Sequence, residues 1–168
     1  VAVSGRGEVV EPLSDSVRKQ LEGRGVLLLL PRLHVSTLWA YGRFLDMGEA
    51  FDSLVDSKDR IYSFLSGETS LEDCLHNNFE PVVFPKFVGL HAVKAMAQAT
   101  DCGPVLLCGS GSTLFILLPE AGLVPVVETG LFHELRDVFG PEFGLAKARL
   151  KPCFPIPFNL RQGLKPTF

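Results

Sequence analysis

The residues best suited to chemistry in this sequence form a short glycine- and hydroxyl-rich stretch, Gly109-Ser110-Gly111-Ser112-Thr113. Its two glycines allow positive φ angles, and its three hydroxyls with nearby backbone N–H groups could bind an anion. The stretch lies between two apolar runs, residues 105–107 and 114–118, so it equally fits the turn of a β-hairpin. It is neither a dinucleotide fingerprint nor a P-loop, because no third glycine and no Gly-Lys-Ser/Thr follow. The stretch alone leaves both interpretations open.

The cysteines and histidines form no pattern that indicates a metal or a nucleophile. The cysteines include no CxxC pair and the histidines stand far apart; they are Cys74, Cys102, Cys108, Cys153, His34, His76, His91 and His133. Zinc sites and catalytic triads need partners at recognisable spacings. We therefore predict reduced thiols and no metal site, and we assign no chemistry to the histidines.

The composition is that of an ordinary globular chain. Its 168 residues are 46% hydrophobic and 21% charged, which predicts one soluble domain with a sizeable core. The net charge of −3 and scattered basic residues argue against a nucleic-acid partner. No apolar run reaches the roughly 20 residues that a membrane helix needs, so no membrane partner is expected. The chain begins with Val1 rather than Met, which suggests a piece of a longer protein.

The elements that would position the glycine stretch begin with an extended segment over residues 1–13 and an apolar strand over residues 26–30. After the strand, Ser36 or Thr37 fits the N-cap of a helix. Leu38, Tyr41 and Phe44 follow at three-residue spacing, which favours one helical face and a plain core role for Tyr41. A helix start at this end of a strand is a common place for ligands.

The later elements are predicted to be mainly helical around the glycine hairpin. Short helices are expected within residues 46–67 and 71–75, then one begun by Asn77 or Asn78 as cap, and a packed helix over residues 86–100. A helix within residues 121–139 and a strand over residues 143–150 follow the hairpin. The Pro- and Phe-rich tail is expected to form a strap that buries Phe154, Ile156 and Phe158. This order predicts an α+β fold of ferredoxin-like type, an antiparallel sheet with helices on one face.

Four stretches, in order, resemble the 4-diphosphocytidyl-2-C-methyl-D-erythritol kinase family of the GHMP kinase superfamily. Gly5-Arg6-Gly7-Glu8 with Glu11-Pro12-Leu13 resembles its GxGExLxPL segment. Residues 27–31 with Val35-Ser36-Thr37 and Tyr41 resemble its strand and VST helix. Asn77-Asn78-Phe79-Glu80 resembles its Asn-Asp-x-Glu helix start, and residues 109–115 resemble its third glycine motif.

The resemblance implies the C-terminal half of a kinase, with residues 1–30 as the end of an N-terminal domain and linking strands, and residues 31–168 as the C-terminal domain. Such enzymes transfer the ATP γ-phosphate to the 2-hydroxyl of a cytidyl diphosphate substrate in non-mevalonate isoprenoid biosynthesis. ATP and Mg²⁺ would bind through the absent N-terminal half, which also supplies the catalytic Asp and Lys. We therefore expect no catalytic residue in this chain and no kinase activity from it alone. A bacterial cytoplasm or a plastid would be its location.

The resemblance also assigns substrate contacts to this half. Tyr41 would stack on the cytosine ring, with Thr37 and Leu38 beside it and Arg6 between the first glycines. The glycine motif (Gly109, Ser110, Gly111, Ser112, Thr113) would face the ATP-phosphate loop and the reacting end of the substrate. Cys108 stands where Ser is usual, Asn78 where Asp is usual, and Leu38 where a small residue or Pro is frequent.

Two other interpretations stay open. One is the C-terminal domain of another GHMP kinase, such as a homoserine or mevalonate kinase, against which the GRGE and VST segments count. The other is a free-standing ferredoxin-like domain that binds a ligand. A phosphate loop encoded upstream of Val1 would favour the kinase, and a start codon there would favour the binding domain.

Overall fold

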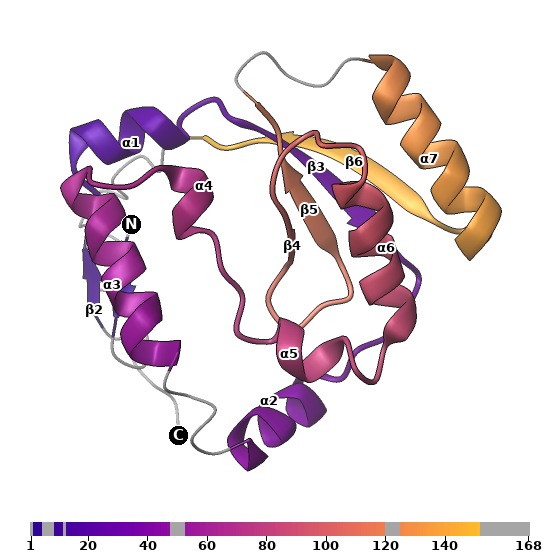
Figure 1. The fold of residues 1–168 in the computed structure, drawn as a ribbon, viewed down its shortest axis with the longest axis horizontal. Coiled ribbons are helices and arrows are strands. Elements are labelled where there is room, and N and C mark those ends of the chain that lie inside the picture. Colours follow the sequence, from indigo (N-terminus) through magenta and orange to yellow (C-terminus); the bar gives the residue numbers. More distant parts are fainter. Residues whose placement is uncertain (1, 5–8, 12, 48–52, 120–124, 152–168) are drawn as a thin grey trace, which may run out of the picture.

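A four-stranded antiparallel sheet lies at the centre of the molecule, with the strand order β4-β5-β3-β6. The computed structural model describes residues 2–4, 9–11, 13–47, 53–119 and 125–151. The elements, in chain order, are β1 (Ala2–Ser4), β2 (Val9–Glu11), α1 (Asp15–Leu21), β3 (Gly25–Leu30), α2 (Thr37–Asp46), α3 (Ser53–Ser66), α4 (Leu71–Cys74), α5 (Glu80–Val83), α6 (Val88–Gln98), β4 (Val105–Leu107), β5 (Leu114–Leu117), α7 (Pro125–Phe139) and β6 (Gly144–Arg149) (Figure 1).

The central strand of the sheet is β3, as its continuous apolar sequence predicts. It pairs on one side with β5, where Leu27 faces Ile116, and on the other with β6, where Leu28 faces Ala146. The hairpin partner of β5 is β4, at one edge of the sheet. Along the chain these elements follow the order strand, helices, two hairpin strands, helix and strand, and in the sheet the strands lie in the order β4-β5-β3-β6. This is the ferredoxin-like arrangement, so the predicted α+β fold class is confirmed.

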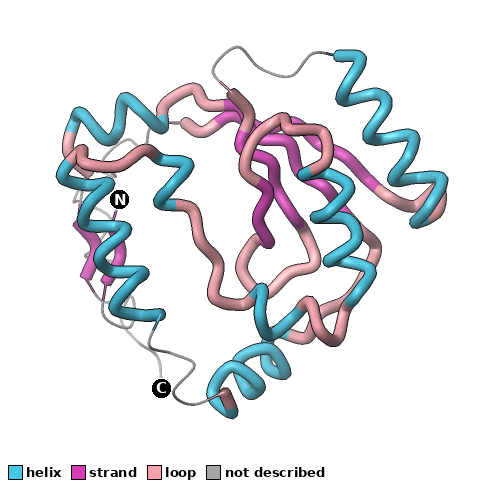
Figure 2. The backbone as a smooth tube through the Cα atoms, viewed as in Figure 1, coloured by secondary structure: helices cyan, strands magenta, loops and turns pink. Residues whose placement is uncertain are grey.

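One face of the sheet packs against α6 and α7. Alternate residues of the strands supply the sheet's side of this core, including Leu27, Leu29 and Leu114. The helices contribute residues at helical spacing: Leu90, Val93 and Ala97 from α6, and Leu131 and Leu135 from α7. Figure 2 shows both helices on the same side of the strands. The packed helix predicted over residues 86–100 is therefore confirmed as α6, Val88–Gln98.

The other face of the sheet is also covered, which differs from the predicted helices on one face. Val26 and Leu117 of the sheet pack with Val17 of α1, Phe64 of α3 and Leu71 of α4 in a second, smaller cluster. The physical reason is that β3 is apolar at consecutive positions. Its even-numbered residues would be left in water if only α6 and α7 packed on the sheet.

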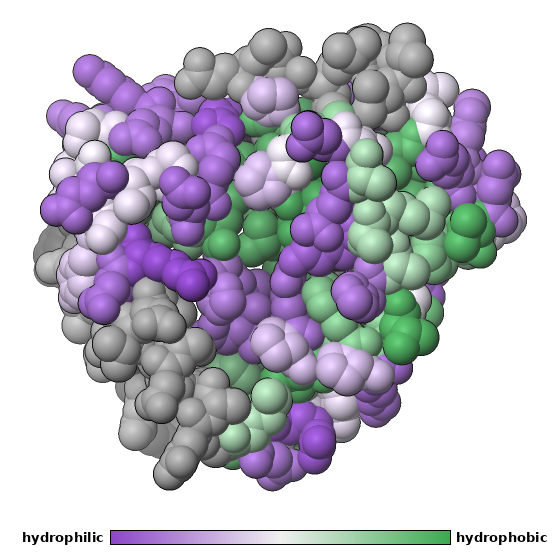
Figure 3. Space-filling view, in the orientation of Figure 1, coloured by the Kyte–Doolittle hydropathy of each residue, from purple (hydrophilic) through white to green (hydrophobic). Residues whose placement is uncertain are grey.

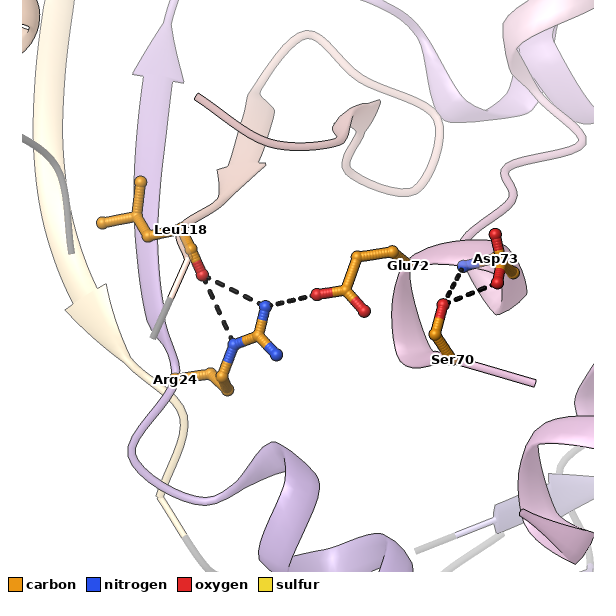
Figure 4. Close-up of polar contacts among 5 residues, drawn as sticks. All are labelled: Arg24, Ser70, Glu72, Asp73 and Leu118. Carbon is orange, nitrogen blue, oxygen red and sulfur yellow. Dashed lines mark hydrogen bonds and ion pairs between the residues drawn. The ribbon is translucent and has the colours of Figure 1, made fainter. Parts of the chain in front are cut away.

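Arg24 ties α4 to the edge of this second cluster (Figure 4). Its guanidinium donates hydrogen bonds to the Leu118 carbonyl, at 3.3 Å from Nε and 3.2 Å from Nη2, and to Glu72 Oε1 at 2.6 Å. The hydrogen bond from Arg24 lowers the pKa of the Glu72 carboxyl. Because Ser70 caps α4, with its hydroxyl accepting from the Asp73 N–H, the helix is fixed at its start as well.

Helix α2 begins as predicted but buries a different face. The Ser36 hydroxyl accepts from the Trp39 N–H, so Ser36 is the N-cap. The buried residue of the helix is Ala40, whereas Leu38 is 85% and Tyr41 is 52% exposed. The prediction of Tyr41 as a core aromatic is therefore wrong, because the helix packs through Ala40 and the half-buried Trp39, which leaves Leu38 and Tyr41 on the outer side.

The remaining predictions divide into three groups. The segment before β3 forms the helix α1, which Ser14 caps, and the strand predicted over residues 143–150 is present as β6. Phe154, Ile156 and Phe158 of the predicted strap lie outside the described residues. The domain boundary at residue 30 stays a prediction, and β3, which precedes it, shares one sheet with the later strands.

Candidate substrate site at the glycine loop

The glycine stretch is the loop between β4 and β5, as the hairpin interpretation requires. Gly109 and Gly111 have φ angles of 53° and 91°, a region that side chains rarely adopt. A Cβ atom on Gly111 would also lie 3.1 Å from Leu107 Cδ1. The Cys108 N–H donates to the Thr113 carbonyl at 2.8 Å, and the Gly111 N–H to the Cys108 carbonyl at 2.9 Å. Both glycines are therefore required by the backbone path of the loop.

Hydroxyl groups fasten this loop to the segment between β3 and α2. Ser112 Oγ donates to the Pro31 carbonyl at 3.1 Å and to the Leu33 carbonyl at 2.6 Å. Ser110 Oγ and Thr37 Oγ1 form a hydrogen bond of 3.1 Å at the start of α2. The glycine stretch and the segment that leads into α2, both predicted to belong to the site, therefore meet in the fold. Ser112 and its two partners in that segment are 79 and 81 positions apart in the chain.

The Asn77-Asn78-Phe79-Glu80 segment holds the other end of the loop. Asn77 Nδ2 donates to the Leu107 carbonyl at 2.5 Å and to the Gly109 carbonyl at 2.8 Å, while Asn77 Oδ1 accepts from the Phe79 N–H at 2.8 Å. Glu80 Oε1 accepts from the Leu107 N–H at 2.8 Å. The N-cap of α5 is Phe79, without a side-chain cap bond. The predicted capping role of Asn77 or Asn78 is therefore wrong, because the Asn77 side chain closes a turn and grips the glycine loop instead.

Three aromatic rings gather beside the loop. Tyr41 meets Phe79 edge to face, with centroids 4.9 Å apart and planes at 72°, and Phe44 lies 5.1 Å from the same Phe79 ring. These rings help line a pocket of about 580 Å³ that also contacts Arg60 and residues 106–109. Figure 3 shows hydrophilic residues across the middle of this face with hydrophobic residues on either side. A mostly apolar wall with a few polar groups is typical of small-molecule pockets.

Two thiols line the same pocket and are held in their protonated form. Burial raises the pKa of both Cys74 and Cys108, with the nearby Arg60 partly opposing the effect at Cys74. A thiolate is needed for nucleophilic attack and metal binding, so neither cysteine is set up for chemistry at neutral pH. The three cysteines in the described part of the chain are free, and the reduced state of the thiols stays a prediction.

The predicted substrate residues differ in where they lie. Tyr41 lines the pocket, and Thr37 contacts the glycine loop. Leu38 is exposed and is absent from the pocket wall. Arg6 lies outside the described residues. Sequence reasoning missed Arg60 and Phe79 as pocket residues, because Arg60 comes from a surface helix and Phe79 stands in what reads as ordinary helix sequence.

The described residues assemble no recognisable cation site. No three His, Cys, Asp or Glu side chains in ranges 2–4, 9–11, 13–47, 53–119 and 125–151 are grouped to hold a metal ion. The expectation that this chain holds no metal stays a prediction. Within the same ranges, no helix is long and apolar enough to cross a membrane.

The chain is similar in sequence to several kinases. It is 33% identical over 121 residues to the 4-diphosphocytidyl-2-C-methyl-D-erythritol kinase of Nitratidesulfovibrio vulgaris (strain DP4), an alignment that covers 68% of this chain and 38% of the relative. It is 31% identical over 144 residues to the kinase of the same name from Synechococcus sp. (strain JA-2-3B'a(2-13)), with 80% and 45% covered. The chain is homologous to part of these kinases.

A solved structure gives the same result for the fold. The crystal structure of a 4-(cytidine 5'-diphospho)-2C-methyl-D-erythritol kinase matches with a TM-score of 0.57 and 25% sequence identity, over 89% of this chain and 48% of that one. No protein-family model matches the chain. The chain therefore spans about two fifths of the length of the curated relatives and about half of the solved kinase.

Proposed function

We propose that this chain is the substrate-side part of a kinase that phosphorylates the 2-hydroxyl of 4-diphosphocytidyl-2-C-methyl-D-erythritol, in non-mevalonate isoprenoid biosynthesis. The observation that carries the proposal is the meeting of three separate segments at one pocket. The glycine loop contacts the start of α2 through Ser110 and Thr37, and the Asn77–Glu80 segment contacts the loop from the other side. The names of the homologous kinases support this substrate.

Tyr41 is the residue proposed to hold the cytosine ring. Its ring is half exposed and is oriented by its edge-to-face contact with Phe79, so one aromatic surface is both accessible and fixed. Stacking a base on an aromatic side chain contributes about 1–3 kcal/mol and does not distinguish one base from another. The hydrogen bonds that select cytosine are therefore proposed to come from outside this chain, with Arg6 and Thr37 near the substrate.

The glycine loop is proposed to form one wall of the phosphoryl-transfer site. Phosphoryl transfer depends on positioning and on stabilising charge, both of which need a rigid frame. Hydrogen bonds from Ser112 and Asn77 hold the two ends of the loop to neighbouring segments. The described residues do not form a magnesium ligand set, so ATP and Mg²⁺ are proposed to bind through the part of the kinase that this chain does not match.

Two preparations test the proposed function. The first is this chain alone, and the second is a hybrid kinase in which the chain is fused to the unmatched part of the Nitratidesulfovibrio vulgaris relative. With ATP, Mg²⁺ and substrate, we expect turnover from the hybrid and none from the chain alone. Turnover by the chain alone would contradict its predicted dependence on the other part. No turnover by the hybrid, with both preparations folded, would count against the kinase itself.

The Tyr41→Ala substitution tests the stacking role within the hybrid kinase. Loss of a stacking surface should raise the KM for the cytidyl substrate about tenfold or more and leave the KM for ATP nearly unchanged. Tyr41→Phe keeps the ring and should keep the KM. Tyr62→Ala is the matched control, because Tyr62 is also exposed, at 66%, on α3 and is not part of the pocket wall. An unchanged substrate KM in Tyr41→Ala would remove Tyr41 from the site.

A further inference from the structure

Leu107 is the last residue of an edge strand, and among the described residues no further strand lies beside its outward polar groups. Both are bonded by side chains of one short segment instead. Glu80 Oε1 accepts from the Leu107 N–H at 2.8 Å, and Asn77 Nδ2 donates to the Leu107 carbonyl at 2.5 Å. Edge groups left without partners are costly when covered, so these two side chains replace a missing strand.

The Glu80 carboxylate is held in this position by a partly buried partner. Its second oxygen, Oε2, lies 2.5 Å from Lys94 Nζ of α6, and the two side chains are only 17% and 16% exposed. Removing one member of such a pair leaves the other charged and poorly solvated. Each oxygen of Glu80 therefore has a separate bond, one to the sheet and one to a helix that packs on the first core.

Asn77 bonds both the end of β4 and the start of the glycine loop. The same amide nitrogen that bonds Leu107 also donates to the Gly109 carbonyl at 2.8 Å, and its oxygen is fixed by the Phe79 N–H. Gly109 is where the backbone enters the positive φ region. Asn77 therefore sets the direction in which the glycine loop leaves β4. Glu80, three residues later in the chain, bonds the N–H of Leu107 at the end of the same strand.

We propose that Asn77 and Glu80, with Lys94 holding the Glu80 charge, are positioning residues that set the placement of the Gly109–Thr113 loop relative to the transferred phosphoryl group. The inference rests on the proposed function, since it assigns a catalytic consequence to a brace seen in the fold. Glu80 is absent from the pocket wall, and Asn77, which lies in it, is assigned its role through its bonds to the backbone. Their effect passes through the Leu107 and Gly109 backbone, so it should fall on kcat rather than on substrate binding at Tyr41.

The test compares two charge-neutral pairs in the hybrid kinase. Glu80→Gln/Lys94→Met keeps an acceptor for the Leu107 N–H, whereas Glu80→Ala/Lys94→Met removes it, and neither leaves an unpaired buried charge. A displacement near 1 Å can cost about 10²-fold in rate, so we expect kcat of the alanine pair to fall by about ten- to hundredfold with a nearly unchanged substrate KM. The glutamine pair should keep most of the wild-type kcat.

Two further variants accompany this comparison. Asn77→Asp keeps the acceptor for the Phe79 N–H but loses the donor to Leu107 and Gly109, so its kcat should also fall. Glu128→Gln/Lys147→Met removes an ion pair between α7 and β6, away from the loop, and should leave kcat unchanged. Equal kcat values for the alanine and glutamine pairs would overturn the proposal, even if one of the other variants failed to fold.

Amide hydrogen exchange in the chain alone separates this proposal from the proposed function. Exchange at Leu107 should be faster in the alanine pair than in the glutamine pair, whatever the hybrid does. If the alanine pair exchanges faster at Leu107 but keeps its kcat, Glu80 stabilises the strand end without affecting catalysis. That result would overturn the positioning role and would leave the proposed kinase function unaffected. Equal exchange would overturn the brace itself. A hybrid without turnover would overturn the proposed function, and the catalytic consequence with it.

Discussion

Ser112 fastens the far end of the glycine loop by donating to two carbonyls, so its hydroxyl contributes to stability beyond any role near a substrate. A hydrogen bond of this kind has a net worth of about 1 kcal/mol. We expect Ser112→Ala to lower the free energy of unfolding of the chain by about that amount, measured by urea titration. Ser66→Ala is the control, because the Ser66 hydroxyl bonds the Ser63 carbonyl within α3 in an exposed position. Equal losses in the two variants would contradict the fastening role.

At this scale the sequence indicated which residues gather but not what their side chains do. Thr37 and the glycine loop were expected at one site, and they do meet. Asn77 was expected to cap a helix, because Asn before an acidic helix start usually does so. Its actual contacts lie 30 and 32 positions away in the chain, and no local pattern contains that information.

Helix α6 shows how sharply one element divides into buried and exposed residues. Leu90 is fully buried against the sheet, and Val88 on the same helix is 71% exposed. Leu90→Ala should lower the free energy of unfolding by about 2–5 kcal/mol, since it leaves a cavity in the core. Val88→Ala should change it by less than about 0.5 kcal/mol. Denaturant unfolding of both variants checks the difference, and similar values would contradict the described packing of α6.

Helices and strands were predicted more accurately than the contacts of single side chains, for reasons that differ from one element to the next. The continuous apolar run of β3 fits a strand that is covered on both faces, and the three- to four-residue spacing in α6 fits a helix with one buried face. The face of α2 was predicted wrongly, since Leu38, Tyr41 and Phe44 have the same spacing as core residues. Burial of Ala40 instead depends on how closely α2 approaches its neighbours, which the sequence does not state.

For the whole molecule, the Arg24–Glu72 pair should make stability depend on pH in the acid range. The bond from Arg24 lowers the folded-state pKa of Glu72 below its ordinary value of 4.5. The stabilisation is therefore fully present above pH 4.5 and is lost as the pH falls through the lower folded-state pKa. Because the Glu72 side chain is 41% exposed, solvent screening limits its size.

Urea titrations between pH 7 and pH 3 measure this effect as a difference between variants. Glu72→Gln should be less stable than the unaltered chain at neutral pH, and the gap should close as the pH falls. Glu142→Gln is the control, because Glu142 is exposed and lies 4.0 Å from an equally exposed Arg32. A gap for Glu72→Gln that stays constant down to pH 3 would rule out the assigned linkage.

The central place of β3 has a consequence for how the chain is made. A ribosome completes β3 before either of its partner strands, because Val26 pairs with Leu117 of β5 and Gly25 pairs with Arg149 of β6. Until β6 has been synthesised, the apolar strand β3 has at least one unpaired edge. An unpaired edge of this kind favours pairing between nascent chains. Closure of such distant contacts is slow. The same topology that brings the glycine loop to its site therefore leaves β3 open to pairing with other nascent chains until β5 and β6 have been made.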